Sequence, residues 1–157
     1  MRSYFEKLLN PSQPQKQLPF IVPLLIALIS GAIFSLALAP YNFWWLAILS
    51  PALLYAVLRQ RNPKQAFVLG WAYGFGLWFV GAFWLYTSIH TYGDTNAFLS
   101  ILMIVFMAAA MGLFTAFQTW LYRRFFPETP LTFAPLWVMF EWAKTWVFTG
   151  FPWLFAG

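Results

Sequence analysis

Five long stretches of this sequence are nearly free of charged residues, and they restrict the folds open to the chain more than any other feature. The first extends from Pro19 to Ala39 without a charge, and about 20 apolar residues suffice to cross the hydrocarbon core of a bilayer. The other four cover residues 43–58, 66–89, 97–122 and 133–149. Only 8% of the residues are charged, whereas a soluble domain carries about 25%. We therefore predict an all-α integral membrane fold, a bundle of about five transmembrane helices that follows a polar tail over residues 1–18.

Two of these stretches allow a second interpretation. The first ends in an Ala-Leu-Ala sequence at 37–39 that resembles a signal-peptide cleavage site. It is longer than a signal core, however, and Pro40 stands where cleavage would occur. The second stretch is short and contains Pro51, which also fits a re-entrant segment. The basic loop at 59–64 that follows it favours a true crossing.

Lysines and arginines alternate between the polar segments in a way that orients the chain. Three lie in the tail 1–18, three in the loop 59–64 and two in the loop 123–128, whereas the turn 40–42 and the loop 90–96 hold none. Because cytoplasmic loops are enriched in these residues, we predict a cytoplasmic N-terminus and an extracytoplasmic segment 149–157. The net charge of +5 is then explained by basic residues in cytoplasmic segments, and we expect no nucleic-acid partner.

Small residues recur at helical spacing in three of the stretches and predict where helices pack. Within each stretch they share one helix face: Ala27, Gly31 and Ser35 in the first, Gly70, Gly74 and Gly81 in the third, and Ala108, Gly112 and Ala116 in the fourth. Such faces let helices approach closely, so we expect packing within one bundle rather than a dimer motif. The opposite side of the third stretch carries an aromatic stripe of Phe75, Phe79, Phe83 and Tyr86.

Glu141 and Lys144 are the charged residues inside the five stretches. A charge at the centre of a membrane helix costs about 2.5–3.5 kcal/mol, so it is usually paired or functional. Their spacing places both on one helix face, where they can meet. Two interpretations stay open: an internal ion pair that fixes helix packing, or a polar contact for a phospholipid head group or a partner domain. Intramembrane charges also mark solute pathways, so a small transporter or channel subunit is an alternative function, and a structural anchor is another.

The residue types present exclude several kinds of site. The sequence has no cysteine, hence no disulfide and no thiol nucleophile. Its four acidic residues and its single histidine, His90, predict no metal site, and no motif predicts a cofactor. His90 is a candidate general base, but a lone loop histidine is more often a polar cap. The aromatic rings near the outer rim are interpreted as the interfacial belt of a membrane protein.

A set of short motifs carries a family resemblance that composition and spacing alone do not. In chain order they are Ala39-Pro40-Tyr41 with Trp44, Gly70 with Gly74 and Gly76, Trp84 and Tyr86 with Ser88 and His90, Pro135 with Trp137, Glu141 with Lys144, and Thr149-Gly150-Phe151-Pro152-Trp153. From about residue 30 to its end, the sequence resembles the amino-terminal membrane part of the apolipoprotein N-acyltransferase family. The family usually has arginine in place of Lys144, and a lysine pairs with Glu141 without the planar two-pronged contact of arginine.

The resemblance implies an enzyme of the bacterial cytoplasmic (inner) membrane, with eight spans and an extracytoplasmic nitrilase-like domain inserted before the last span. A Glu-Lys-Cys triad in that domain would take an acyl chain from a phospholipid and pass it to the amino group of a diacylglyceryl-cysteine lipoprotein. The triad is expected beyond Gly157, so residues 1–157 alone are predicted to be inactive without that C-terminal domain. Gly150 and Trp153 match family positions associated with function, and we predict them, together with Glu141 and Lys144, as substrate contacts.

Overall fold

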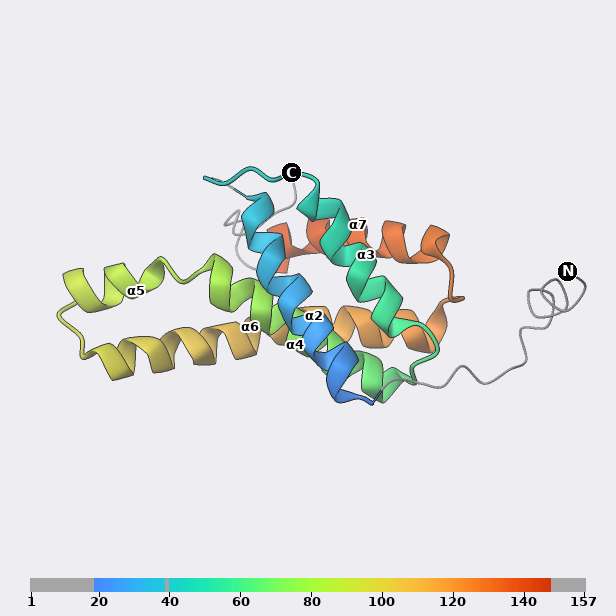
Figure 1. Ribbon diagram of the computed structural model, residues 1–157, viewed down its shortest axis with the longest axis horizontal. Coiled ribbons are helices and arrows are strands. Elements are labelled where there is room, and N and C mark those ends of the chain that lie inside the picture. Colours follow the sequence, from blue (N-terminus) through green and yellow to red (C-terminus); the bar gives the residue numbers. More distant parts are fainter. Residues whose placement is uncertain (1–18, 39, 148–157) are drawn as a thin grey trace, which may run out of the picture.

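The computed structural model of the chain describes residues 19–38 and 40–147, and these are mostly helical (Figure 1). The elements are α2 (Ile21–Phe34), the 3-10 turn η1 (Ser35–Ala37), α3 (Leu46–Leu58), α4 (Pro63–Gly81), α5 (Leu85–Thr87), the π-helical turn η2 (Ser88–Tyr92), α6 (Ala97–Phe125) and α7 (Pro130–Val147). These described ranges contain no strand, which confirms the all-α part of the prediction.

The helix α6 is long and apolar enough to cross a membrane. Within the described ranges it is the one continuous helix with these properties. The helix α4 and the segment Leu85–Tyr92 meet the same criteria only as a pair, and that pair is bent by 58°. The segments Ile21–Ala37 and Leu46–Leu58 are apolar but shorter. The described part of the chain therefore contains one helix that could cross a membrane, or two if the bent pair is a single span. The five-span bundle remains a proposal.

The third predicted stretch differs most from its prediction. Expected as one helix over 66–89, it begins at Pro63 and breaks after Gly81. Its start is set by a capping box, in which the Asn62 side chain accepts a hydrogen bond from the Gln65 N–H at 2.8 Å and the Gln65 side chain accepts one from the Asn62 N–H at 3.3 Å. Hydropathy shows no sign of the break, because apolar residues continue across it.

The other boundaries shift by a few residues. The second helix begins at Leu46 rather than at 43, the fourth continues to Phe125, and the fifth begins at Pro130 rather than at 133. The expected loop 90–96 is helical as far as Tyr92. Residues 1–18, 39 and 148–157 lie outside the described part of the chain, so the ends of the first and fifth predicted spans do too.

Glycines bring α2 and α4 into backbone contact, as the small-residue faces predict. A Cβ atom added at Gly31 would lie 1.9 Å from the carbonyl oxygen of Tyr73. A Cβ atom at Gly76 would lie 2.2 Å from the carbonyl oxygen of Leu28, on the other helix of the same pair. Both distances are far below van der Waals contact, so any side chain here would force the two helices apart.

A second glycine contact joins α4 to α6. A Cβ atom at Gly70 would lie 2.0 Å from Oγ1 of Thr119, and one at Gly74 would lie 2.8 Å from the Cα atom of Gly112. The Thr119 hydroxyl donates a hydrogen bond to the Ala66 carbonyl across the same interface, at 2.8 Å. The packing prediction is therefore confirmed for two of the three glycines in the α4 stripe. The third, Gly81, is the half-buried last residue of the helix.

Aromatic side chains, rather than close backbones, attach α7 to the bundle. Trp137 meets Tyr73 edge to face, with ring centroids 5.7 Å apart, and lies 6.4 Å from the ring of Phe34. Phe133 meets Tyr122 at 5.2 Å, and Phe140 meets Phe114 at 5.3 Å. Because rings and not small residues span this interface, α7 stands farther from its neighbours than α2 and α6 stand from α4.

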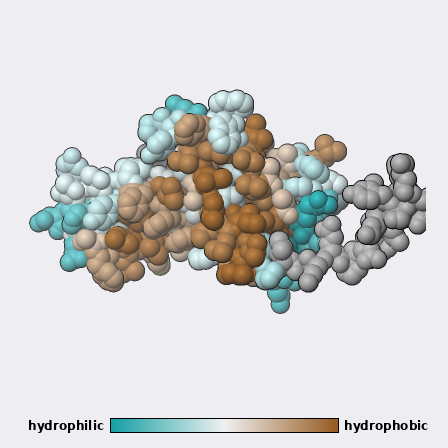
Figure 2. All heavy atoms as spheres, in the orientation of Figure 1, coloured by the Kyte–Doolittle hydropathy of each residue, from teal (hydrophilic) through white to brown (hydrophobic). Residues whose placement is uncertain are grey.

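The end of α4, α5, η2 and the first part of α6 extend as a two-helix arm away from α2, α3 and α7 (Figure 1). The predicted aromatic stripe follows this arm as a ladder of ring contacts: Phe75 to Phe79 at 5.6 Å, Phe79 to Phe83 at 5.9 Å, Phe83 to Tyr86 at 5.8 Å, and Tyr86 to His90 at 5.1 Å. Figure 2 shows hydrophilic residues at the tip of the arm and apolar residues over the middle of the molecule.

Candidate functional site

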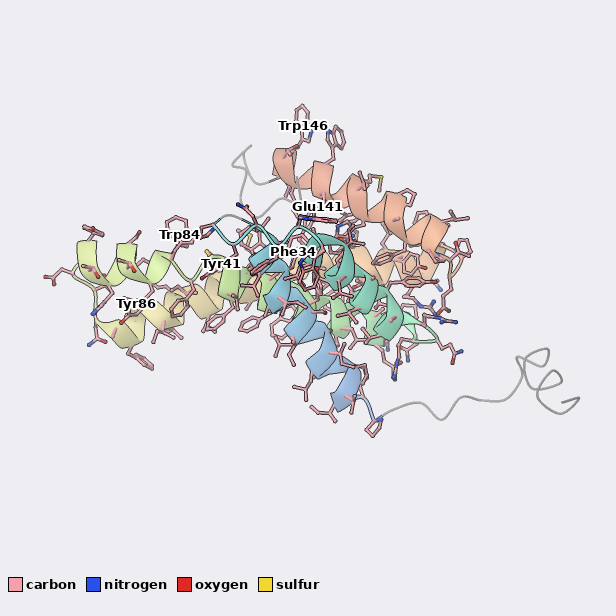
Figure 3. All side chains as sticks on the ribbon, turned by 45° about the horizontal axis from the view of Figure 1, so that its top comes forward. Phe34, Tyr41, Trp84, Tyr86, Glu141 and Trp146 are labelled. Atoms are coloured by element: carbon pink, nitrogen blue, oxygen red, sulfur yellow. The ribbon has the colours of Figure 1, made fainter. Side chains whose placement is uncertain are left out.

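The two charged residues of α7 form an ion pair on the side of the helix that faces the bundle. Nζ of Lys144 lies 2.6 Å from Oε1 of Glu141, and only 4% of the lysine side chain and 16% of the glutamate side chain are exposed. Figure 3 shows Glu141 directed toward the other helices and Trp146 directed away from them. The predicted meeting of the two charges is confirmed. Because each charge is neutralised by the other, their presence in the membrane does not by itself indicate a solute pathway.

The pair leaves one buried acceptor without a partner. In the described part of the chain, Oε2 of Glu141 makes no hydrogen bond, and neither does Nε2 of Gln118 on α6. Buried polar atoms are nearly always hydrogen-bonded, since an unsatisfied one costs about 1–3 kcal/mol. The free carboxylate oxygen is therefore the group at this site with capacity for a donor from elsewhere.

A chain of hydroxyl groups lies among the neighbouring helices. Oγ of Ser50 on α3 donates a hydrogen bond to the Ser30 carbonyl on α2 at 2.6 Å. The same oxygen lies 2.7 Å from the hydroxyl of Tyr73, which is completely buried. Because the Ser50 proton is used toward Ser30, the Tyr73 hydroxyl is the donor in the second bond. The chain ties α2, α3 and α4 together.

Tyr73 connects this hydroxyl chain with the charged pair. Its ring meets Trp137, which stands one helical turn before Glu141 on α7. Ser30, Ser50 and Tyr73 were not predicted from the sequence as members of the site. The available signal was weak, because single hydroxyl groups inside apolar stretches are common in membrane helices.

The remaining predicted site residues lie elsewhere. Gly150 and Trp153 fall outside the described residues, directly after the described end of α7 at Val147. Nδ1 of His90 lies 2.7 Å from the Thr95 carbonyl, and its ring lies tilted against that of Tyr86, so the imidazole closes the tip of the arm. That contact supports the interpretation of His90 as a polar cap. No group of three or more possible metal ligands occurs in the ranges that the structure covers.

Ionic contacts hold two basic loops together at the opposite end of the bundle. Nη1 of Arg123 lies 2.7 Å from Oε2 of Glu128, and Nε of Arg123 donates a hydrogen bond to the Arg61 carbonyl at 2.8 Å. Oε1 of Glu128 accepts a hydrogen bond from the Gln60 N–H at 2.7 Å. The loops 59–64 and 123–128 therefore lie side by side, as expected if both face the same side of a membrane.

Comparison with known proteins assigns the chain to a family. The family described as "Apolipoprotein N-acyltransferase N-terminal domain" matches residues 30–157. The chain is 45% identical over 139 residues to a protein named apolipoprotein N-acyltransferase from Pseudomonas syringae pv. tomato. Proteins of the same name from Azotobacter vinelandii and Coxiella burnetii are 44% and 42% identical.

These matches cover most of this chain but a small part of each relative. They extend over 85% of the chain for the Pseudomonas and Azotobacter proteins and 84% for the Coxiella protein. The matched part amounts to 28%, 27% and 28% of the length of those relatives, respectively. The starting residue, 30, agrees with the resemblance inferred from the motifs. The chain belongs to the apolipoprotein N-acyltransferase N-terminal domain family.

Proposed function

We propose that the chain is the membrane-embedded amino-terminal part of an apolipoprotein N-acyltransferase in the bacterial inner membrane. The observation that carries this proposal is the identity of up to 45% over 85% of the chain to proteins of that name. The reaction would transfer an acyl chain from a phospholipid to the N-terminal amine of a diacylglyceryl-cysteine lipoprotein. The sequence has no cysteine, so the nucleophile would belong to a domain outside these residues.

The surface of the described helices supports embedding in lipid. Large apolar side chains are exposed on every long helix, among them Ile29 on α2, Ile48 on α3, Phe106 on α6, and Val138 and Trp142 on α7. Soluble monomers rarely expose contiguous apolar patches larger than a few hundred Å². The joined basic loops support an orientation with 59–64 and 123–128 in the cytoplasm and the tip of the arm outside.

Cysteine labelling of residues 1–157 tests this orientation, since these residues contain no cysteine of their own to interfere. We expect a membrane-impermeant maleimide to label Thr91→Cys in intact spheroplasts, because residue 91 is exposed at the tip of the arm. Lys64→Cys, exposed in the first turn of α4 at the basic end of the bundle, is expected to react only after the membrane is permeabilised. The opposite labelling pattern would show that the proposed orientation is inverted.

In this proposal the charged pair contacts the substrate or the catalytic domain. The free Oε2 of Glu141 accepts hydrogen bonds, so it suits the ammonium of a phosphatidylethanolamine head group or a backbone N–H of the catalytic domain. Gly150 and Trp153 follow Lys144 by six and nine residues in the sequence, and the proposed orientation puts them on the same side of the membrane. We assign these four residues to the entrance through which lipid reaches the thiol.

Acyl transfer by the full-length enzyme tests the proposed function. The purified enzyme, reconstituted with phosphatidylethanolamine, is expected to convert a diacylated lipopeptide into a triacylated product detected by mass spectrometry. Trp153→Ala is expected to lower the rate at least tenfold. Trp146→Ala, which removes an outward-facing and 72% exposed ring of the same type, should leave the rate within about twofold. A folded wild-type enzyme that forms no triacylated product would refute the proposal.

A further inference from the structure

The helices α3 and α7 enclose a groove of about 290 Å³ that lies apart from the charged pair. Its lining includes Ile48, Ala52 and Tyr55 on α3, and Phe133, Ala134 and Trp137 on α7. At one end the two helices meet through the rings of Tyr55 and Phe133, whose centroids are 5.3 Å apart. Along the rest of the groove the alanines leave space between the helices, and the polar side-chain groups of the lining are the Tyr55 hydroxyl and the Trp137 indole N–H.

The shape and chemistry of the groove fit a hydrocarbon chain. From Ile48 to Tyr55 the groove follows α3 for about 10 Å, at 1.5 Å per residue. Its volume lies near the lower limit of small-molecule pockets, about 300 Å³. A polar ligand would find no ion pair and almost no hydrogen-bonding group in it, whereas an acyl chain needs neither. The groove also opens on the flank of the helices, where the proposed bilayer would lie.

An arginine lies beyond the Tyr55 end of the groove. Arg59 follows Tyr55 by one helical turn, directly after the end of α3, and its side chain is exposed. It enters no ion pair with the residues that the structure covers. The neighbouring arginines differ, since Arg61 is buried and Arg123 is paired with Glu128. A guanidinium group in this position suits a phosphate, which it can contact through two parallel hydrogen bonds.

We infer that this groove binds one acyl chain of an anionic phospholipid from the cytoplasmic leaflet, with its phosphate paired to Arg59. The inference rests on the proposed membrane embedding and orientation, which put the basic end of the bundle at the inner leaflet. The bound lipid takes no part in acyl transfer. It fills the space between α3 and α7 and thereby supports a helix that is attached to the bundle mainly by aromatic rings.

Native mass spectrometry of the full-length protein in detergent tests this site with dioleoyl-phosphatidylglycerol as the probe. Ala52→Phe places a ring inside the groove, so we expect it to weaken the tightest lipid-binding event at least tenfold. Ala56→Phe adds the same ring one turn along α3, at an exposed alanine outside the lining, and should change binding less than twofold. Equal lipid retention by Ala52→Phe and the wild type would overturn the inference.

The head-group contact is tested separately and does not depend on filling the groove. Arg59→Gln is expected to weaken phosphatidylglycerol binding about fivefold, the effect of one basic residue near an anionic lipid. Lys64→Gln, which removes an exposed charge from the first turn of α4, should have less than a twofold effect. Equal effects of the two variants would overturn the assignment of Arg59. If instead a further helix of the full-length protein occupies the groove, no tight lipid will be retained, which also overturns it.

Acyl transfer measured on the same variants separates this inference from the proposed function. Ala52→Phe that loses the tight lipid but still forms triacylated product supports a lipid site independent of the reaction. Wild-type protein that retains the lipid but transfers no acyl chain refutes the proposed function and leaves the lipid site standing. Circular dichroism verifies that each variant keeps its helical content. Should Ala52→Phe fail to fold, the comparison of Arg59→Gln with Lys64→Gln still decides.

Discussion

Replacing Lys144 by methionine is expected to destabilise the helical bundle by about 3–5 kcal/mol, the usual effect of removing one partner from a buried ion pair. The lysine is 3% exposed, and its ammonium group holds Oε1 of Glu141 at 2.6 Å. The other oxygen of this carboxylate already makes no hydrogen bond within the described residues. Without Lys144 the whole negative charge would be left in an apolar interior. The measurement is the midpoint of unfolding in mixed micelles of increasing SDS content.

A double variant distinguishes the loss of pairing from the loss of packing. Glu141→Gln combined with Lys144→Met removes both charges, so it should be more stable than Lys144→Met alone by about 2 kcal/mol or more. Thr145→Ala, beside Lys144 on the same helix, removes only a local hydrogen bond to the Trp142 carbonyl and should cost less than about 1 kcal/mol. If the double variant is less stable than either single variant, the two charges do not act as a pair.

Replacing Gly76 by alanine is expected to destabilise the fold by about 3 kcal/mol or more, at the upper end of what overpacking costs. The added Cβ atom would lie 2.2 Å from the Leu28 carbonyl oxygen, and a backbone atom cannot move aside as a side chain can. Gly31→Ala should act at least as strongly, because its Cβ atom would lie 1.9 Å from the Tyr73 carbonyl oxygen. The same SDS titration, followed by circular dichroism, measures both.

Gly81→Ala is the matched control for this effect. It makes the same chemical change on the same helix, at a half-buried position at the end of α4. Alanine favours helix over glycine by about 1 kcal/mol, so the variant should be neutral or slightly more stable. The outcome that would contradict the packing of α2 against α4 is a Gly76→Ala variant as stable as Gly81→Ala.

The sequence predicted the helix contacts better than the helix ends. The spacing of Gly70 and Gly74 identified a close contact because a missing side chain acts directly on the distance between two helices. The break after Gly81 could not be predicted, since the residues on both sides of it are equally apolar. Hydropathy indicates whether a segment lies in an apolar environment. A backbone can bend within such an environment, so hydropathy does not reveal the bend.

The candidate site was predicted in part for a similar reason. The three-residue spacing of Glu141 and Lys144 was enough to predict their pairing, because both lie on one helix. The contact of Tyr73 with Ser50 joins two helices, and its formation depends on how these helices cross. The geometry with which two helices cross cannot be predicted from a single sequence. The predicted roles of Gly150 and Trp153 remain predictions, since both lie outside the described residues.

The length of α6 has a consequence for where the arm ends. Its 29 residues extend about 43 Å at 1.5 Å per residue, whereas the hydrocarbon core is about 30 Å thick. With Arg123 and Arg124 held at the cytoplasmic surface, a helix close to upright would emerge about 10 Å above the opposite surface. The turn at residues 93–96 would then stand clear of the lipid tails, in water.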